Sequence, residues 1–521
     1  MSLTQALHRG VQQNPHHLYS VHGTRAFTYE QVAQRVSRIA GGLSNLGLAP
    51  EDRVAILALN SDDYLHCLLA IAWADGICVP VNTRWSQPEI IASLEEAEVS
   101  MLIVDDTFAG MAPNIAEAVP SLTRVLHAGQ EEPGPGFAAR ISDLAERSQQ
   151  IADAHRGGDS TLGLFYTGGT TGQSRGAVLS HQALDATALA FAAALPLDAD
   201  AVYLVSAPLF HLAQFSGWVA STQFGATQVV LPSFDPEEVM RLIQEHRVTR
   251  AVLVPTMLHA IVHHPAAAQY DLSSLDTVIY GGSPISQATL EQARKLLPGA
   301  GFLQVYGMTE MSAVATILAP ADHHDPRLTT SAGRAALHTR IEIVDPDTHA
   351  PVPCGTVGEI RVRGYGMMGG YWKRDTETTA VISEDGWLST GDAGHLDERG
   401  YLFVVDRVKD MIISGGENVY SAEVENVIAR HPAVAQCAVI ALPHDQWVET
   451  VHAVVVLAPG ASLDLADLQA HCRPHLAGYK CPRGLTLLDS LPVSGAGKIL
   501  KRRLRDDLTS SNLRTTGETS R

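Results

Sequence analysis

Apolar residues recur along this chain with two periods, about 3.6 residues and two residues, and stretches of the two kinds alternate. The first example follows Phe27, where Thr28 and Gln31 have the spacing of a capping box for a helix that reaches Leu46. Up to Pro120 the pattern then predicts strand Arg53–Ala58, helix Asp62–Ala74 and strand Ile77–Val81. Alternation of this kind indicates a layered α/β domain.

A short apolar strand is predicted at Leu162–Tyr166, and a second α/β layer is predicted after the glycine- and threonine-rich stretch that follows it. Ser180 is a candidate N-cap for a helix that ends before Pro196. The other predicted elements are the strands Val202–Ser206, Thr227–Leu231, Arg250–Val254 and Thr277–Tyr280, and the helices Glu237–Glu245 and Gln287–Leu297.

Two later changes of pattern divide the chain further. Period-two runs with Pro and Gly turns at Arg340–Arg363 predict a small β-rich subdomain. Beyond Lys409 the predicted elements are strands at Met411–Ile413, Val434–Leu442, Thr450–Leu457 and Leu485–Leu488, and helices around Val424–Ile428 and at Asp464–His471. We therefore expect an α/β protein with a large N-terminal domain (1–408) of layered α/β subdomains plus the β-rich subdomain. A small, mobile α+β C-terminal domain (409–521) follows, and its polar end, 509–521, is expected to be disordered.

Composition narrows the functional class. The net charge is −19, and no long Lys/Arg run offsets it, which argues against a nucleic-acid or anionic-membrane partner. The six cysteines form no C-x-x-C pair, which argues against disulfide and cysteine-zinc scaffolds and fits a reducing cytosol. The longest apolar run, near Ala186–Leu197, is shorter than the roughly 18 residues of a membrane span. We expect a cytoplasmic monomer or homodimer without an integral membrane segment.

The most informative stretch is Leu164–His181, which is crowded with glycine and threonine. Glycine lets backbone N–H groups approach a ligand closely and threonine adds neutral donors, so this composition suits a phosphate-binding loop, although a flexible surface turn is the alternative. A Walker A loop is excluded because Gly176 is followed by Ala177, and no G-x-G-x-x-G fingerprint is present. The loop residues of interest are Thr167, Gly168, Gly169, Thr170, Thr171, Gly172 and Arg175.

This stretch resembles the phosphate loop of the adenylate-forming superfamily, usually written YTSGTTGxPKG. That superfamily includes the acyl-CoA synthetases, the peptide-synthetase adenylation domains and the beetle luciferases. Gly169, Ser174 and Arg175 stand where serine, proline and lysine are usual. The resemblance implies that the loop binds ATP, and Arg175 keeps the charge of the usual lysine.

The segment Gln304–Glu310, QVYGMTE, is similar to the superfamily's xxYGxTE segment. Mg²⁺ takes one or two carboxylates together with phosphate oxygens and water, so Glu310 is the candidate magnesium ligand. An exposed glutamate at a helix start is the alternative. The resemblance implies that Tyr306 packs near the adenine, that Thr309 contacts phosphate, and that Gly307 and Met308 lie at the nucleotide and acyl sites.

Three further segments stand in the superfamily's order. The resemblance implies that Asp392, in Thr390-Gly391-Asp392, accepts the ribose hydroxyls, and that Arg407 adds a positive fork near the ribose and α-phosphate. Gly281, Gly282 and Ser283 resemble the loop against the adenine and acyl pocket. Alone, the motif Thr390-Gly391-Asp392 is an ordinary turn, and Gly281-Gly282-Ser283 is a weak turn signal.

The acyl pocket is assigned to the segment after Pro208. His211 is predicted beside the incoming carboxylate, although a structural histidine is the alternative, and Gln214 and Phe215 are predicted to line the pocket. Because its neighbours are mostly apolar, we expect a mostly apolar acid.

The C-terminal domain carries the remaining candidates. Lys498 resembles the terminal catalytic lysine, which neutralises charge as carboxylate attacks the α-phosphate, whereas a solvated surface charge is the alternative. Lys409 matches the hinge about which the superfamily rotates this domain. The candidate CoA-binding residues are Gly415, Gly416, Trp447, Tyr479 and Arg483. Val448 stands in place of the usual glycine, which weakens the assignment of Trp447.

Together these segments predict an ATP-dependent acid:CoA ligase that uses Mg²⁺. The carboxylate and ATP would give acyl-AMP and pyrophosphate, and CoA would then give acyl-CoA and AMP from a medium-chain fatty or aromatic acid. The alternatives are a stand-alone adenylation enzyme that loads a carrier protein and a nucleotide-binding protein without turnover. Light emission is a further alternative, which no motif supports.

Overall fold

The computed structural model describes residues 2–167, 174–195, 199–407, 410–414, 417–444, 448–493 and 499–509. Backbone contacts divide the chain into two compact units. The first comprises Met1–Ile341 and Val362–Leu388, and the second comprises Glu342–Arg361 and Ser389–Arg521. The domain boundary expected at Lys409 falls inside the second unit, at a residue outside the described ranges, and stays a prediction.

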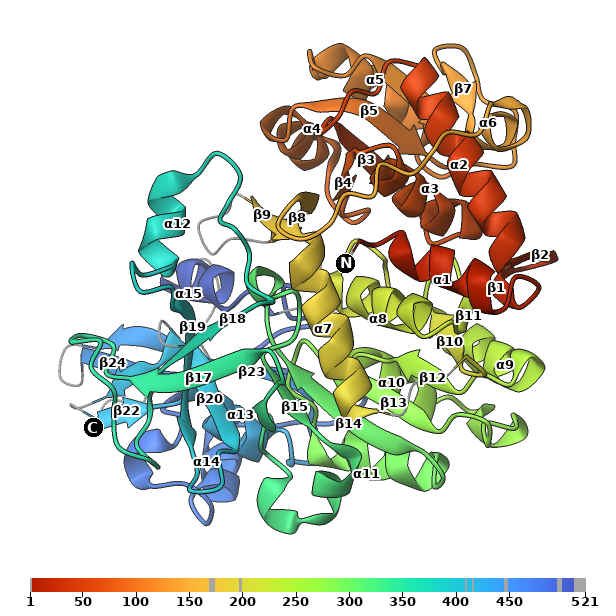
Figure 1. Ribbon diagram of the computed structural model, residues 1–521. Coiled ribbons are helices and arrows are strands. Elements are labelled where there is room, and N and C mark those ends of the chain that lie inside the picture. Colours follow the sequence, from red (N-terminus) through yellow and green to blue (C-terminus); the bar gives the residue numbers. More distant parts are fainter. Residues whose placement is uncertain are drawn as a thin grey trace. The chain divides into compact units, whose positions relative to one another are not determined.

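In the described part of the first unit, one sheet has seven strands. Their spatial order is β7 (Ala139–Arg140), β6 (Arg124–His127), β5 (Val99–Val104), β3 (Arg53–Leu57), β4 (Ile77–Pro80), β8 (Thr161–Thr167) and β9 (Arg175–Ser180). Only the β8–β9 pair is antiparallel among these neighbours. The helices α4 (Gln87–Glu96) and α5 (Ala112–Ala118) pack on one face, and Figure 1 shows α2 (Tyr29–Asn45) and α3 (Asp62–Trp73) on the other, near α6 (Ile141–Arg147).

The second sheet of this unit has nine strands over the described residues. Their order is β16 (Arg334–Ala335), β15 (Thr316–Leu318), β14 (Gly301–Tyr306), β13 (Thr277–Gly281), β12 (Arg250–Val252), β10 (Val202–Val205), β11 (Thr227–Val230), β1 (Leu18–His22) and β2 (Arg25–Thr28). The helices of this region are α1 (Gln5–Gln13), α7 (His181–Ala194), α8 (Leu212–Gln223), α9 (Pro236–His246), α10 (Pro255–Val262) and α11 (Gln287–Leu296). Strand β1 pairs in parallel with β11, so an N-terminal segment completes a sheet built mainly from residues beyond 200.

A four-stranded sheet follows in the sequence, in the order β17 (Thr339–Val344), β18 (Gly358–Gly364), β19 (Leu388–Leu396) and β20 (Leu402–Arg407). Helix α12 (Asp375–Val381) lies between β18 and β19 in the sequence. Strands β19 and β20 are antiparallel, and their register sets Asp392 opposite Arg407. The period-two run predicted at Arg340–Arg363 is thus two strands joined by a turn-rich segment.

The C-terminal sheet of the second unit contains β22 (Glu417–Val419), β21 (Ile412–Ser414), β24 (Val448–Leu457), β23 (Val434–His444) and β25 (Gly484–Leu487). Its two faces are covered by helices α13 (Ser421–Ile428) and α14 (Leu465–Cys472) on one side and α15 (Lys501–Thr509) on the other. The alternation of a strand explains this division, since Val439 and Ala441 of β23 face α13 and α14 while Ala438 and Ile440 face α15.

Local signals in the sequence explain where several helices begin. Thr28 and Gln31 form the predicted capping box of α2. The Ser180 hydroxyl accepts from the backbone N–H of Ala183 at the start of α7. The predicted α/β fold class is confirmed, whereas several elements were not predicted, among them β1, β2, β9, α1, α8 and α15.

Two expectations about composition can be compared with the structure. All six cysteines are free thiols, so none forms a disulfide. No helix in the described ranges combines the length and the apolar character that crossing a bilayer requires.

Candidate active site

The β8–β9 hairpin positions the glycine- and threonine-rich loop. Thr167, the last residue of β8, pairs with Arg175, the first residue of β9, so the two flank the mouth of the loop. The predicted residues Gly168, Gly169, Thr170, Thr171 and Gly172 lie outside the described residues. Both Thr167 and Arg175 are partly exposed, so their side chains remain accessible at this mouth.

A tyrosine joins this hairpin to the predicted magnesium ligand. The Tyr371 hydroxyl donates to Oε1 of Glu310 at 2.6 Å, and the guanidinium carbon of Arg175 lies 5.4 Å from the centre of the Tyr371 ring. Backbone bonds between Val178 and residues 369 and 370 add the segment before Tyr371 to the edge of β9. Arg175, Tyr371 and Glu310, far apart in the sequence, therefore form one polar group at the loop mouth.

The charge state of this group follows from burial. Burial, and then the neighbouring carboxylate, raise the pKa of Tyr371 well above its usual value, so the phenol is neutral at neutral pH. Glu310 is 6% exposed and forms no ion pair with any Lys or Arg in the described part of the chain. Among the described residues, Glu310 is therefore held by a neutral donor and not by a cation.

The ends of the parallel strands β13 and β14 carry the next predicted residues. Gly281 pairs with Val305, and a Cβ on Gly281 would lie 2.1 Å from the Val305 carbonyl oxygen. A Cβ on Gly307 would lie 2.3 Å from the carbonyl oxygen of Ala313. Only glycine fits at either position, and ligands of open α/β sheets bind at such carboxyl ends of strands.

The other candidates on these loops differ in exposure. Gly282 has φ +77° and is exposed, as is Ser283. Tyr306, Met308 and Thr309 are partly buried, and a short 3₁₀ helix, Thr309–Met311, carries Glu310. These side chains follow the ends of neighbouring strands.

The predicted acyl-pocket residues start helix α8. His211 is its N-cap residue and is partly exposed, with its ring 4.4 Å from that of Phe210. Gln214 is fully buried, accepts from the Ala207 N–H and donates to the Tyr203 hydroxyl. Phe215 is also fully buried, edge-on to Phe165 of β8 at 4.9 Å. Gln214 and Phe215 thus support the wall behind His211, and their role as lining residues stays a prediction.

In the second unit, Asp392 and Arg407 form an ion pair. Nε of Arg407 lies 2.7 Å from Oδ1 of Asp392, and its NH1 group reaches the Thr390 carbonyl oxygen at 3.4 Å. The Thr390 hydroxyl accepts from the Asp392 N–H. The pair is a direct consequence of the β19–β20 register, and it brings together two residues predicted for the same ribose.

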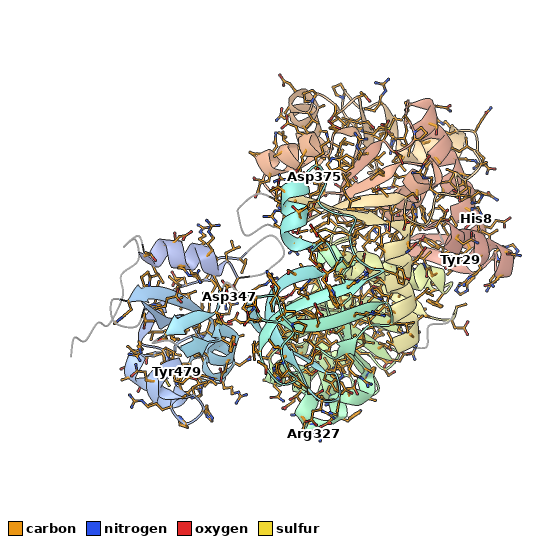
Figure 2. All side chains as sticks on the ribbon, turned by 60° about the vertical axis from the view of Figure 1, so that its left-hand side comes forward. His8, Tyr29, Arg327, Asp347, Asp375 and Tyr479 are labelled. Carbon is orange, nitrogen blue, oxygen red and sulfur yellow. The ribbon has the colours of Figure 1, made fainter. Side chains whose placement is uncertain are left out.

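The candidate CoA residues are described only in part. Tyr479 lies in a 3₁₀ turn against the core of the C-terminal sheet, where Figure 2 labels it, and Nζ of Lys480 lies 5.8 Å from its ring centre. Arg483 donates its backbone N–H to Val451. The remaining predicted residues, Lys409, Gly415, Gly416, Trp447 and Lys498, lie outside the described residues.

Sequence reasoning missed two groups. Tyr371 lies 61 residues from Glu310, so no local spacing could reveal the contact, although its place after Gly369 and Gly370 marks an unusual aromatic. The second group surrounds Lys501 of α15, whose Nζ lies 2.8 Å from Oε1 of Glu425 and contacts the Ser421 hydroxyl.

This second group is a buried charge network. Oδ2 of Asp406 accepts from the hydroxyl and N–H of Ser421. Burial acts to lower the pKa of Lys501, but Glu425 and Asp406 raise it on balance, so the ammonium stays charged. The network ties the start of α15 to α13 and to the end of β20.

Comparisons with known proteins extend over nearly the whole chain. Residues 7–372 match the family described as AMP-binding enzyme, and residues 423–498 match the AMP-binding enzyme C-terminal domain. The chain is 40% identical over 498 residues to a feruloyl-CoA synthase of Amycolatopsis sp, covering 95% of this chain and 97% of that one. It is 36% identical to the fatty acid–[acyl-carrier-protein] ligase ScoC of Streptomyces coeruleorubidus, covering 92% of each chain. The crystal structure of ATP-bound MatB from Rhodopseudomonas palustris matches with a TM-score of 0.89 at 29% identity, covering 98% of this chain and 100% of that one.

Proposed function

This chain belongs to the AMP-binding enzyme family and is an enzyme of the acid:thiol ligase class, and we propose that it joins a medium-chain fatty or aromatic carboxylate to coenzyme A through an acyl-AMP intermediate. The observation that carries the proposal is the group of Arg175, Tyr371 and Glu310 at the mouth of the phosphate loop. It offers a cation for phosphate and a charged carboxylate for a metal ion within one site.

The donor set fits ATP with Mg²⁺. Tyr371 holds Oε1 of Glu310, which leaves Oε2 as the oxygen for a hard cation that takes few protein ligands. Bound Mg²⁺ would supply charge neutralisation on the phosphates. Arg175 would bind phosphate oxygens through its fork, and Thr167 and Thr309 would add neutral donors.

Further residues are assigned to the ribose and to the adenine. The Asp392–Arg407 pair would accept ribose hydroxyls through the carboxylate while its guanidinium stays near the α-phosphate. Tyr306 would pack near the adenine, and the narrow backbone at Gly281 and Gly307 would let the nucleotide approach the strand ends.

The acid and the acceptor are the finer parts of the proposal. His211 would lie beside the carboxylate, with apolar neighbours favouring an apolar acid. Lys498 would neutralise charge in the first half-reaction, and rotation of the C-terminal domain about Lys409 would then present Gly415, Gly416, Trp447, Tyr479 and Arg483 to CoA.

A carrier protein is the second candidate acceptor. The relative ScoC, at 36% identity, is named as a ligase of fatty acids to an acyl-carrier protein. The feruloyl-CoA synthase is more similar, at 40% identity, and a relative named indoleacetate–CoA ligase from Aromatoleum aromaticum also favours CoA.

The test is a pyrophosphate-release screen over fatty and aromatic acids, with and without CoA and with a phosphopantetheinylated carrier protein. We expect acid-dependent pyrophosphate release and thioester formation with CoA. If a thioester formed only on the carrier protein, the carrier protein would replace CoA as the proposed acceptor. If no acid caused pyrophosphate release, the proposed reaction would be rejected. In Lys498→Ala, loss of adenylation with retained thioester formation from supplied acyl-AMP would support the division of labour, and equal loss of both steps would oppose it.

A further inference from the structure

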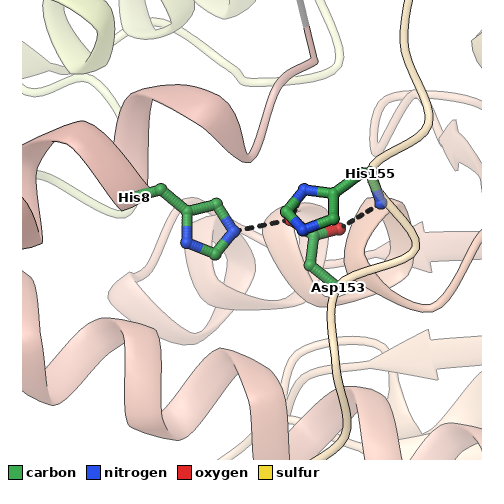
Figure 3. A group of neighbouring side chains, drawn as sticks. All are labelled: His8, Asp153 and His155. Atoms are coloured by element: carbon green, nitrogen blue, oxygen red, sulfur yellow. Dashed lines mark hydrogen bonds and ion pairs between the residues drawn. The ribbon is translucent and has the colours of Figure 1, made fainter.

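Two histidines and an aspartate that are not among the residues assigned to ATP meet on the first unit. His8 lies on α1, and Asp153 and His155 lie on the segment between α6 and β8 (Figure 3). Oδ2 of Asp153 is 2.7 Å from Nε2 of His8 and 3.5 Å from Nδ1 of His155. One ligand atom from each residue lies within 4.8 Å of the others.

The surrounding structure holds these side chains in place. The Trp73 indole donates to the Ile151 carbonyl, and the Ala154 N–H donates to the carbonyl of Trp73, so the segment is bound to α3. The ring of His8 lies 4.8 Å from that of Trp73. His155 has φ +53°, and its N–H donates to Oδ1 of Asp153 at 2.8 Å. The left-handed backbone thus turns His155 back onto Asp153.

The charge of Asp153 is compensated differently from that of Asp62 and Asp63. Its side chain is 1% exposed, and its ion-pair partners in the described part of the chain are these two histidines alone. Arg156, three residues on, pairs with Glu51 and Asp75 instead.

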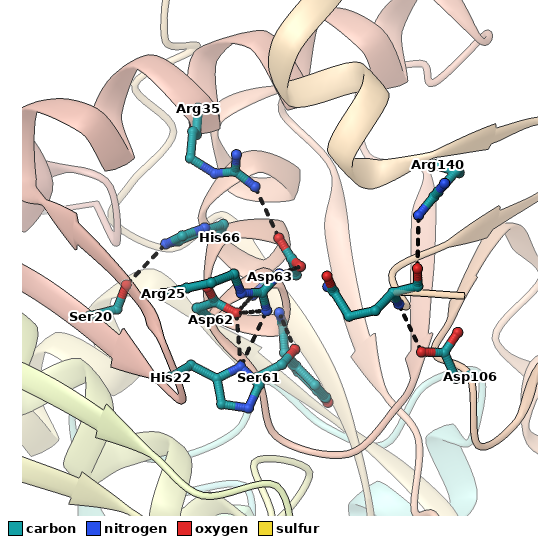
Figure 4. Close-up of polar contacts among 12 residues, drawn as sticks. Ser20, His22, Arg25, Arg35, Ser61, Asp62, Asp63, His66, Asp106 and Arg140 are labelled. Atoms are coloured by element: carbon teal, nitrogen blue, oxygen red, sulfur yellow. Dashed lines mark hydrogen bonds and ion pairs between the residues drawn. The ribbon is translucent and has the colours of Figure 1, made fainter. Parts of the chain in front are cut away.

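The buried acids of α3 provide the contrast. In Figure 4, Asp62 and Asp63 are contacted by arginines: Arg25 contacts both, and Arg35 contacts Asp63. A neutral imidazole does not balance a buried carboxylate, whereas a divalent cation bound by neutral imidazoles does.

We propose that His8, Asp153 and His155 bind a divalent transition-metal ion of the Zn²⁺ class. Two imidazole nitrogens with one carboxylate oxygen form a three-residue donor set that Zn²⁺ uses with water in the fourth position. Zinc bonds of about 2.0 Å in a tetrahedron separate ligand atoms by about 3.3 Å, so the 2.7 and 3.5 Å separations need only small side-chain movements. The ion would clamp α1 to the segment that leads into β8, and the proposal does not depend on the proposed reaction.

Calorimetric titration of chelator-treated full-length protein with Zn²⁺ tests the site. We expect one site per chain, a visible Co²⁺ spectrum of tetrahedral type, a rise in thermal midpoint with Zn²⁺, and no corresponding effect of Mg²⁺, which prefers oxygen ligands. His155→Asn should weaken Zn²⁺ affinity at least tenfold. Asparagine tolerates the left-handed backbone, and the His155 side chain is 66% exposed, so the variant should fold.

His349→Asn is the matched control, since His349 is also an exposed histidine, with φ +56°. It should bind Zn²⁺ like wild type. Equal weakening in both variants, or no site in the wild type, would overturn the proposal. Weaker Zn²⁺ binding in His263→Asn instead of His155→Asn would also overturn the proposal, because it would assign the bound ion to the adjacent His259–His263 pair on α10. If His8, Asp153 and His155 stabilised the protein equally with and without metal, they would form a protonated ion pair and not a metal site.

Discussion

Glu310 and Asp392 are two nearly buried carboxylates, 6% and 8% exposed, with opposite surroundings. Glu310, in the first unit, is held by the neutral hydroxyl of Tyr371. Asp392, in the second, is paired with the guanidinium of Arg407 at 2.7 Å. Among the described residues, the first acid has a neutral hydrogen-bond donor and no ion pair with Lys or Arg, whereas the second is paired with a guanidinium.

This difference separates two ligand chemistries. An uncompensated carboxylate attracts a hard cation, and its cost of burial falls when that cation binds. A compensated carboxylate still accepts hydrogen bonds from neutral hydroxyls without attracting a second cation. Substitutions of Glu310, Asp392 and Tyr371 test this contrast, in decreasing order of expected effect, and a smaller effect is expected from a buried histidine.

Glu310→Gln should remove the charge with little change of shape. We expect adenylation to slow by about 10²- to 10³-fold, and the Mg²⁺ concentration for half-maximal rate to rise, because the metal loses a charged ligand. The measurement is acid-dependent pyrophosphate release over a Mg²⁺ titration. An unchanged titration would remove Glu310 from the metal site.

Asp392→Asn should affect the nucleotide but not the metal. Loss of a charged acceptor costs about 2 kcal/mol, so the KM for ATP should rise about 30-fold while the Mg²⁺ titration keeps its midpoint. Arg407 is 39% exposed and can be solvated in this variant. A shift of the Mg²⁺ midpoint would contradict the contrast, because it would place the metal at both acids.

Tyr371→Phe should leave Glu310 charged but unoriented. We expect a rate reduction of about 10-fold with a raised Mg²⁺ midpoint, since a hydrogen bond to a charged group contributes about 1.5 kcal/mol. Tyr365→Phe is the control, because Tyr365 is exposed and outside the site. If the Mg²⁺ response of Tyr371→Phe matched that of the control, the tyrosine would not act through Glu310.

Acid unfolding should depend on the buried imidazole of His66. Burial lowers the pKa of His66 from 6.5 to about 4, with Asp62 and Asp63 acting against it. Its contribution is fully present above pH 6.5 and is lost as the pH falls toward 4, because the unfolded chain binds the proton first. His66→Gln should reduce the fall in unfolding free energy between pH 7.5 and 5.5 by about 1.4 kcal/mol. Denaturant titrations at the two pH values measure the unfolding free energy. If it fell as much in His66→Gln as in the wild type, the pH dependence would come from other groups.

Much of the fold could be predicted from sequence because its signals are local. The Thr28–Gln31 capping box, Ser180 as an N-cap and the alternation at Val434–Leu442 each depend on residues close in the chain. Strand β1 could not be placed this way, because its partner β11 is about 200 residues away. Helix α8 was missed because it has no charged residue and is buried nearly all round, so no polar face marks its period.

The order of the site segments, and the residue types that each segment supplies, could be read from the amino-acid sequence. Glycine at 281 and 307 and the carboxylates at 310 and 392 are readable there because their chemistry belongs to single residues. Their partners depend on folding, which brings Tyr371 to Glu310 across 61 residues and His8 to Asp153 across 145. The charge on a buried acid depends on what lies within a few ångströms, and sequence distance carries no information about that.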